Sequence, residues 1–152
     1  MKNQAIGILL TLTAAACGYK DTQTQSASLP LVGTWKLLQG TTIKGNDTTR
    51  TDYTKGQEMI KIISPTHFAF LRHDLQHGKD STADYSAGGG RVTIGEKNYT
   101  EYLDYFNVRE WEGGKFDFEY NISGDTLTIT GIEKVEKLGV NHLNIETYIR
   151  QK

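Results

Sequence analysis

The sequence predicts an all-β domain, an antiparallel up-and-down β-barrel of about eight to ten strands. Short segments in which apolar and polar residues alternate recur at fairly even intervals along residues 31–152, and turn residues such as glycine separate them. The sequence has no long helical pattern that could cover a sheet. Because strands without covering helices must protect their edges, closure into a barrel is favoured, with a β-sandwich as the alternative.

The segment before this domain begins with residues that have the composition of a targeting sequence. Residues 1–16 carry one charge, Lys2, followed by an apolar run that ends in small residues, which is typical of a secretory signal peptide. The run is too short to span a bilayer as a helix. Residues 17–30 are polar and rich in Thr, Gln and Ser, which indicates a flexible tether. The folded domain is therefore expected at residues 31–152.

Cys17 is the single cysteine, and it directly follows Ala14, Ala15 and Ala16. This arrangement resembles a bacterial lipobox, in which small residues precede a cysteine that is diacylated and becomes the first residue after cleavage. Ala14 stands where that motif usually has Leu. The resemblance implies a membrane anchor at Cys17 in the bacterial cell envelope, as an outer-membrane lipoprotein on the periplasmic face or exposed at the surface. The alternative is ordinary signal cleavage that leaves a free cysteine near the new terminus.

The expected strands of the domain are joined by short turns. Their alternation is clearest at residues 115–122, where Phe116, Phe118, Tyr120 and Ile122 share one face and polar residues share the other. One face of this strand should therefore be buried and the other solvated. We expect strands at residues 34–39, 58–64, 67–73, 91–94, 98–106, 115–122, 126–130 and 142–150.

Three connections have distinctive local sequences. Residues 64–66 (Ser-Pro-Thr) predict a hairpin between the second and third strands. Three consecutive glycines at 88–90 indicate a bulge or a sharp bend at a barrel corner. Residues 132–138 fit either a short helix ended by Gly139 or a continuation of the preceding strand.

Composition excludes several classes of protein. The chain has 17 Lys and Arg against 18 Asp and Glu, a net charge of -1, whereas a general nucleic-acid binder needs a basic surface. One cysteine permits neither an internal disulfide framework nor a zinc site of the usual cysteine type. We expect a monomer that binds no nucleic acid.

The two ends of the domain carry a family resemblance. Gly33-Thr34-Trp35 opens the first strand and Arg150 ends the last. This combination resembles the signature of the lipocalin and fatty-acid-binding (calycin) barrels, in which the tryptophan closes the barrel floor and the arginine packs across it. A guanidinium over an indole face is a favourable contact. The resemblance implies a calycin-like barrel with Gly33, Trp35 and Arg150 as its structural signature.

A second resemblance is carried by residues 67–70, 88–90, 99–101, 109–113, 124–127 and 148–150. These segments resemble the lipocalin-like lipoproteins of Bacteroidetes, and the resemblance covers most of residues 31–152. It implies a fold and a location in the envelope, and it implies no activity.

The barrel interior is the expected ligand site, and we expect it to hold a small hydrophobic or amphipathic molecule, mainly apolar. Arg109 and Trp111 lie in a strand connection that fits either the cavity mouth or a turn whose tryptophan covers a barrel end. A one-residue slip in register would reverse which side chains face inward. By alternation, the interior ligand-binding candidates are His67, Leu71, Tyr99, Glu101, Tyr105, Phe116, Phe118 and Tyr120.

Other functions remain open alternatives. His67 and Glu101, if both point inward, could act as an acid–base pair in a cavity enzyme, or they could be a polar pair without catalysis or two rim residues. The barrel could also be filled by its own aromatic side chains and serve a structural or partner-binding role. His73, Asp74 and His77 could ligate a metal but fit a solvated loop better. We expect no metal and no cofactor, and a binding module is favoured over an enzyme.

Overall fold

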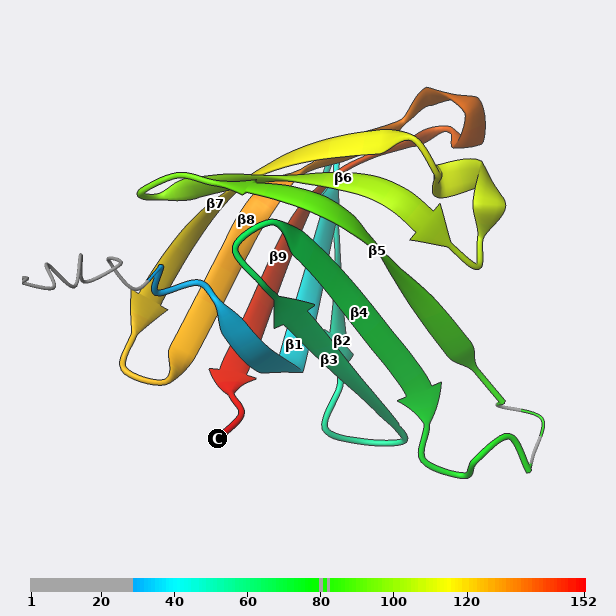
Figure 1. Cartoon of the computed structure of the whole chain (residues 1–152). Helices are drawn as coiled ribbons and strands as arrows, with labels where there is room; N and C mark the ends of the chain where they lie inside the picture. The colour runs from blue at the N-terminus through cyan, green and yellow to red at the C-terminus, as the bar shows by residue number, and fades with distance from the viewer. Residues whose placement is uncertain (1–28, 80, 82) are drawn as a thin grey trace, which may run out of the picture.

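The computed structural model describes residues 29–79, 81 and 83–152, which form antiparallel strands and two short 3-10 helices (Figure 1). The predicted signal peptide at 1–16 and the predicted anchor at Cys17, with the tether up to residue 28, lie outside the described residues. The strands are β1 (Gly33–Lys44), β2 (Asp47–Asp52), β3 (Gln57–Ile63), β4 (His67–Asp74), β5 (Tyr85–Ile94), β6 (Asn98–Phe106), β7 (Gly114–Ser123), β8 (Thr126–Val135) and β9 (Val140–Arg150). The 3-10 helices are η1 (Arg109–Trp111) and η2 (Glu136–Leu138).

The strands close into a barrel. Each strand from β3 to β8 pairs antiparallel with the next strand in sequence, and β1 pairs with both β3 and β9. Eight strands therefore form the closed wall, and β2 is an extra strand beside the second half of β1. The predicted all-β, up-and-down barrel is confirmed, and the sandwich alternative is wrong.

Strand β2 and the first half of β5 are absent from the expected strands. Residues 47–52 (DTTRTD) are almost all exposed and lack an apolar face, so no alternation marks them as a strand. They are held by backbone pairing with β1 across a turn at Gly45. Strand β5 begins at Tyr85, before the glycine run that was expected to precede it.

The glycine run contains the predicted irregularity. The register of β5 against β6 shifts between Gly89 and Gly90, which pair with Tyr105 and Leu103, so Asp104 is an additional residue on β6. A Cβ atom at Gly90 would lie 2.0 Å from the carbonyl oxygen of Tyr102, so only glycine allows this approach of the two backbones. Beyond Leu103, the bulge therefore reverses which side chains of β6 point into the barrel and which point outward.

One end of the barrel is closed by the residues of the expected signature. Trp35 is fully buried, and its Nε1 donates to the carbonyl oxygen of Leu31 at 2.9 Å. The Arg150 guanidinium lies 4.0 Å from the centre of the Trp35 ring system and donates to the carbonyl oxygens of Val32 and Pro30 at 3.2 and 2.7 Å. This floor joins the segment before β1 to the end of β9.

Residues 132–138 combine the two alternatives that the sequence left open. Strand β8 continues to Val135, and only Glu136–Leu138 form a short 3-10 helix. Gly139 follows with a φ of 65°, the left-handed conformation expected after a helix end. In the described part of the chain no helix is long and apolar enough to cross a membrane.

Candidate functional site: the barrel cavity

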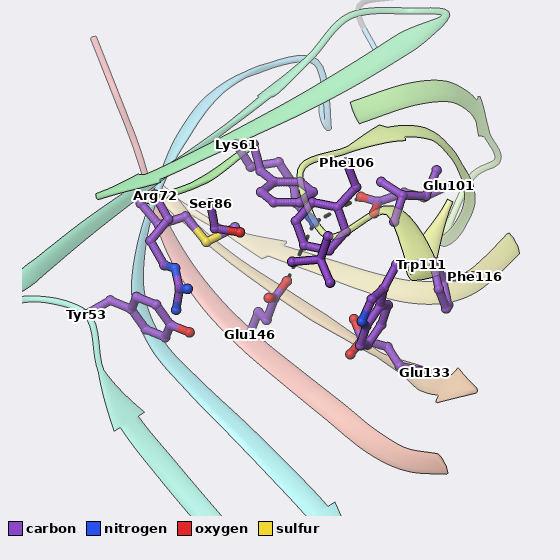
Figure 2. A pocket seen from close by; sticks show the side chains of 14 residues that line it. Tyr53, Lys61, Arg72, Ser86, Glu101, Phe106, Trp111, Phe116, Glu133 and Glu146 are labelled. Carbon is purple, nitrogen blue, oxygen red and sulfur yellow. Dashed lines mark hydrogen bonds and ion pairs between the residues drawn. The ribbon is translucent and has the colours of Figure 1, made fainter. Parts of the chain in front are cut away.

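A cavity of about 380 Å³ occupies the end of the barrel opposite the Trp35 floor (Figure 2). Its residues come from strands β3 to β9 and from the segments that follow β2 and β6. Most of them lie toward the strand ends that antiparallel pairing places away from Arg150. The lining residues are Tyr53, Met59, Lys61, Phe70, Arg72, Ser86, Glu101, Leu103, Phe106, Val108, Trp111, Phe116, Glu133 and Glu146.

Part of the cavity wall is apolar and largely aromatic. Phe70 and Phe106 meet edge to face, with ring centres 5.3 Å apart. Phe106 and Phe116 each lie about 6 Å from Trp111, at 6.3 and 6.1 Å between ring centres. Met59 and Leu103 complete this surface, which is suited to an aliphatic or aromatic part of a ligand.

Another part of the wall is a buried ion network around Lys61. Its Nζ donates to Glu101 Oε1 at 2.9 Å and lies 3.6 Å from Glu146 Oε2, although its side chain is only 5% exposed. Burial disfavours the charged form of Lys61, but Glu101 and Glu146 outweigh it and raise its pKa above the ordinary value. Burial raises the pKa of Glu101, against the opposing effect of Lys61. The Tyr148 hydroxyl donates to Glu146 at 2.6 Å.

Glu133 is a further carboxylate in the cavity, and its partners come from β9. It lies 3.0 Å from His142 Nε2 and accepts a hydrogen bond from Asn144 Nδ2 at 3.2 Å. Burial, and then the negative charge of Glu146, raise the pKa of Glu133. Its side chain is 22% exposed, so it remains accessible to a molecule in the cavity.

Arg72 forms the side of the cavity near Tyr53 (Figure 2). Its Nη2 lies 2.8 Å from Asp84 Oδ2, which supplies its counter-charge. Its Nε is buried and has no hydrogen-bond partner among the described residues.

Several candidate residues do reach the interior. Tyr99, Glu101, Phe116 and Phe118 are buried, and Glu101 and Phe116 line the cavity. Trp111 also lines the cavity, as expected of a residue at its mouth. Tyr99 and Phe118 stack at 5.4 Å in the core below.

Two candidates lie on the outer surface because β4 presents its other face to the core. His67 and Leu71 are exposed, with Leu71 at 40%, whereas Phe68, Phe70 and Arg72 point inward. The assignment of His67 and Leu71 to the interior is therefore wrong. The segment HFAFLRH carries apolar residues on both faces, so its alternation does not identify the buried one.

Three other candidates also lie away from the cavity. Tyr105 is 72% exposed, because the bulge at Asp104 turns it outward and turns Phe106 inward. Arg109 is exposed and pairs with Glu112, so it extends into solvent. Tyr120 is half-buried, and its hydroxyl donates to the carbonyl oxygen of Gly95 in the turn between β5 and β6, at the floor end of the barrel.

The structure does not bring His67 and Glu101 together. His67 lies on the outer face, where its Nδ1 is 2.9 Å from Thr66 Oγ1, and Glu101 is inside with Lys61. This geometry does not support the acid–base pair of an enzyme. Within the described residues, no group of three His, Cys, Asp or Glu side chains is placed to hold a metal ion. The Asp74 carboxylate instead accepts backbone N–H groups of Gly78 and Asp84 at 3.0 and 3.1 Å.

Apart from Glu101, the charged residues of the cavity were missed from the sequence. Lys61 stands in the apolar run Met-Ile-Lys-Ile-Ile, where a charge on the buried face of a strand is a signal of an internal ion pair. Glu133 and Glu146 give no such signal, because the residues around each of them in the strand are a mixture of polar and apolar ones. Their role depends on pairing between strands distant in sequence.

Comparisons with known proteins add no assignment to this site. No family model matches the chain, and a search of curated proteins gives no match. The functional interpretation therefore depends on the cavity itself.

Proposed function

We propose that this protein binds a small amphipathic molecule, mainly apolar, in the open end of its barrel. The observation that carries the proposal is the cavity of about 380 Å³, which combines an aromatic wall with a cluster of charged side chains. Ligand sites in proteins are typically concave, about 300–1,000 Å³ in volume, and lined by apolar groups with a few polar ones. The apolar part of the ligand would contact Phe106, Trp111 and Phe116, and its polar part would face Glu133 and Glu146.

A binding role fits the structure better than the two alternatives. A barrel filled by its own aromatic side chains would leave no cavity of this size. A cavity enzyme of the expected kind would need His67 beside Glu101, and His67 is on the outer surface.

We also propose that the barrel is tethered in the bacterial envelope as a lipocalin-like lipoprotein, anchored through Cys17. The support is the sequence Ala-Ala-Ala-Cys after an apolar run and the contact of Arg150 with Trp35. Cys17→Ser should leave the circular dichroism spectrum unchanged and release the protein from membranes on fractionation. Unchanged membrane retention would count against the anchor.

The binding proposal is tested by native mass spectrometry of the full chain purified from its host. We expect a small-molecule adduct on the wild type. Ser86→Phe should remove the adduct, because Ser86 is buried in the cavity wall and a larger side chain there fills the space. Thr93→Phe, on the same strand but exposed, is the matched control and should retain the adduct. An adduct that persists in Ser86→Phe would place the ligand elsewhere, and a wild type without any adduct would contradict the proposal.

A further inference from the structure

The charges that line the cavity do not balance. The cations of the lining are Lys61 and Arg72, and the anions are Glu101, Glu133 and Glu146. Arg72 is already paired with Asp84, 2.8 Å away. With histidine counted as neutral, Lys61 is left to offset three carboxylates. The cavity therefore has an excess of negative charge.

Lys61 is poorly placed to attract an anionic ligand. Its ammonium group is buried and already contacts two carboxylates, at 2.9 Å in Glu101 and 3.6 Å in Glu146. A ligand carboxylate would have to displace one of them, and it would add a fourth negative charge to a site of low polarity. Lys61 is therefore not free to hold the carboxylate of a fatty acid or of a similar anion.

Glu133 is the carboxylate with most room for a partner. In the described part of the chain it forms no ion pair with lysine or arginine, and its neighbours are His142 and Asn144. Burial and the nearby Glu146 raise its pKa, against the opposing effects of His142 and Lys61.

The Tyr99 hydroxyl is buried in the core below the cavity, close to the same carboxylates. After burial, the negative charges of Glu101 and Glu146 are the largest causes that raise its pKa. The negative charge of this cluster thus acts on the core below the cavity as well as on the cavity wall.

We propose that the ligand of this cavity is an amphipathic cation, with a primary amine or a related cationic group held by Glu133 and Glu146. This inference rests on the proposed binding function and names the class of ligand. Trp111 lines the same cavity, and an indole face is the best aromatic partner for a cation. The apolar part of the molecule then packs against Phe106 and Phe116.

Three ligands of equal chain length and different charge test the proposal: octylamine, octanol and octanoate, titrated into the full-length protein at neutral pH. Trp111 fluorescence reports binding, because the other tryptophan, Trp35, is fully buried in the floor. We expect octylamine to bind at least roughly tenfold more tightly than octanol, the gain of about one charge-assisted contact, and octanoate to bind most weakly. Equal or tighter binding of octanoate would overturn the inference and leave the binding function intact. No binding of any of the three would contradict both proposals.

Glu133→Gln separates the charge from the shape of the site. This variant should lower the affinity for octylamine roughly tenfold and leave the affinity for octanol unchanged, which also shows that the cavity is still folded. Glu119→Gln, an exposed carboxylate on the outer face of β7, is the matched control and should change neither affinity. If Glu133→Gln keeps the octylamine affinity of the wild type, Glu133 does not bind the cation and the proposal fails.

Discussion

Replacing Lys61 by methionine removes the cation between Glu101 and Glu146 while keeping an unbranched side chain of similar length. The Nζ atom lies 2.9 and 3.6 Å from the two carboxylates. At an effective dielectric constant of about 20, these distances correspond to attractions of about 6 and 5 kcal/mol. Burying each ion costs several kcal/mol, so the intact network contributes little net stability. If Lys61 is removed, however, the two carboxylates stay buried, and the attraction that offset the cost of burying them is lost.

We therefore expect Lys61→Met to lower the free energy of unfolding by about 3–5 kcal/mol at neutral pH, measured by urea denaturation. The double variant Lys61→Met/Glu101→Leu should cost clearly less than the sum of the two single changes, because the unpaired carboxylate is gone. Lys115→Met, on an exposed lysine, is the control and should change stability by less than about 0.5 kcal/mol.

The pH dependence of the variant provides a second check. Burial already raises the pKa of Glu101, and removal of Lys61 should raise it further. A carboxyl group whose pKa is raised in the folded state costs no stability while it is protonated. It lowers the stability of the folded protein as the pH rises through that pKa. The cost of Lys61→Met should therefore shrink as the pH is lowered. This account of the network would be refuted if Lys61→Met cost less than about 1 kcal/mol at neutral pH. It would also be refuted if the costs of Lys61→Met and Glu101→Leu added up to the cost of the double variant.

Three further changes test the barrel frame. Trp35→Ala should lower the free energy of unfolding by about 3–5 kcal/mol in chemical denaturation, since a fully buried aromatic is lost from the floor, and a near-neutral result would contradict its role there. Gly90→Ala should destabilise by about 1–3 kcal/mol, because its Cβ would lie 2.0 Å from a backbone oxygen, and an unchanged thermal midpoint would show that the bulge relaxes freely. The backbone N–H groups of Gly78 and Asp84 lower the pKa of Asp74, so its stabilisation is present above its ordinary pKa and is lost as the pH falls through the lowered value. The difference in thermal midpoint between wild type and Asp74→Asn should thus be full above about pH 5 and shrink below about pH 4, and a difference independent of pH would exclude this cause.

The fold was predictable where one face of a strand is apolar and the other polar. Strand β7 shows this plainly, since Phe116 and Phe118 point inward as its alternation indicates. Strand β4 does not, because both of its faces carry apolar side chains. Strand β2 has no apolar face and depends on the backbone of β1 for its conformation.

The cavity was less predictable than the barrel, because its features depend on registers that a single chain segment does not encode. The outward turn of Tyr105 follows from one additional residue, Asp104, opposite a glycine of the neighbouring strand. The pairing of Lys61 with Glu101 joins residues 40 positions apart. Local alternation places a side chain on one face or the other, but only the assembled barrel decides which charges meet.

If the protein is anchored through Cys17 as proposed, the floor contact of Arg150 also sets the orientation of the barrel. Arg150 binds the carbonyl oxygens of Pro30 and Val32, so the entry and the exit of the chain lie together at the closed end. Pro30 therefore lies at the closed end of the barrel, and the cavity opens at the opposite end. Ligand exchange would then take place with the surrounding solution, and a probe fused after Lys152 would leave the opening unobstructed.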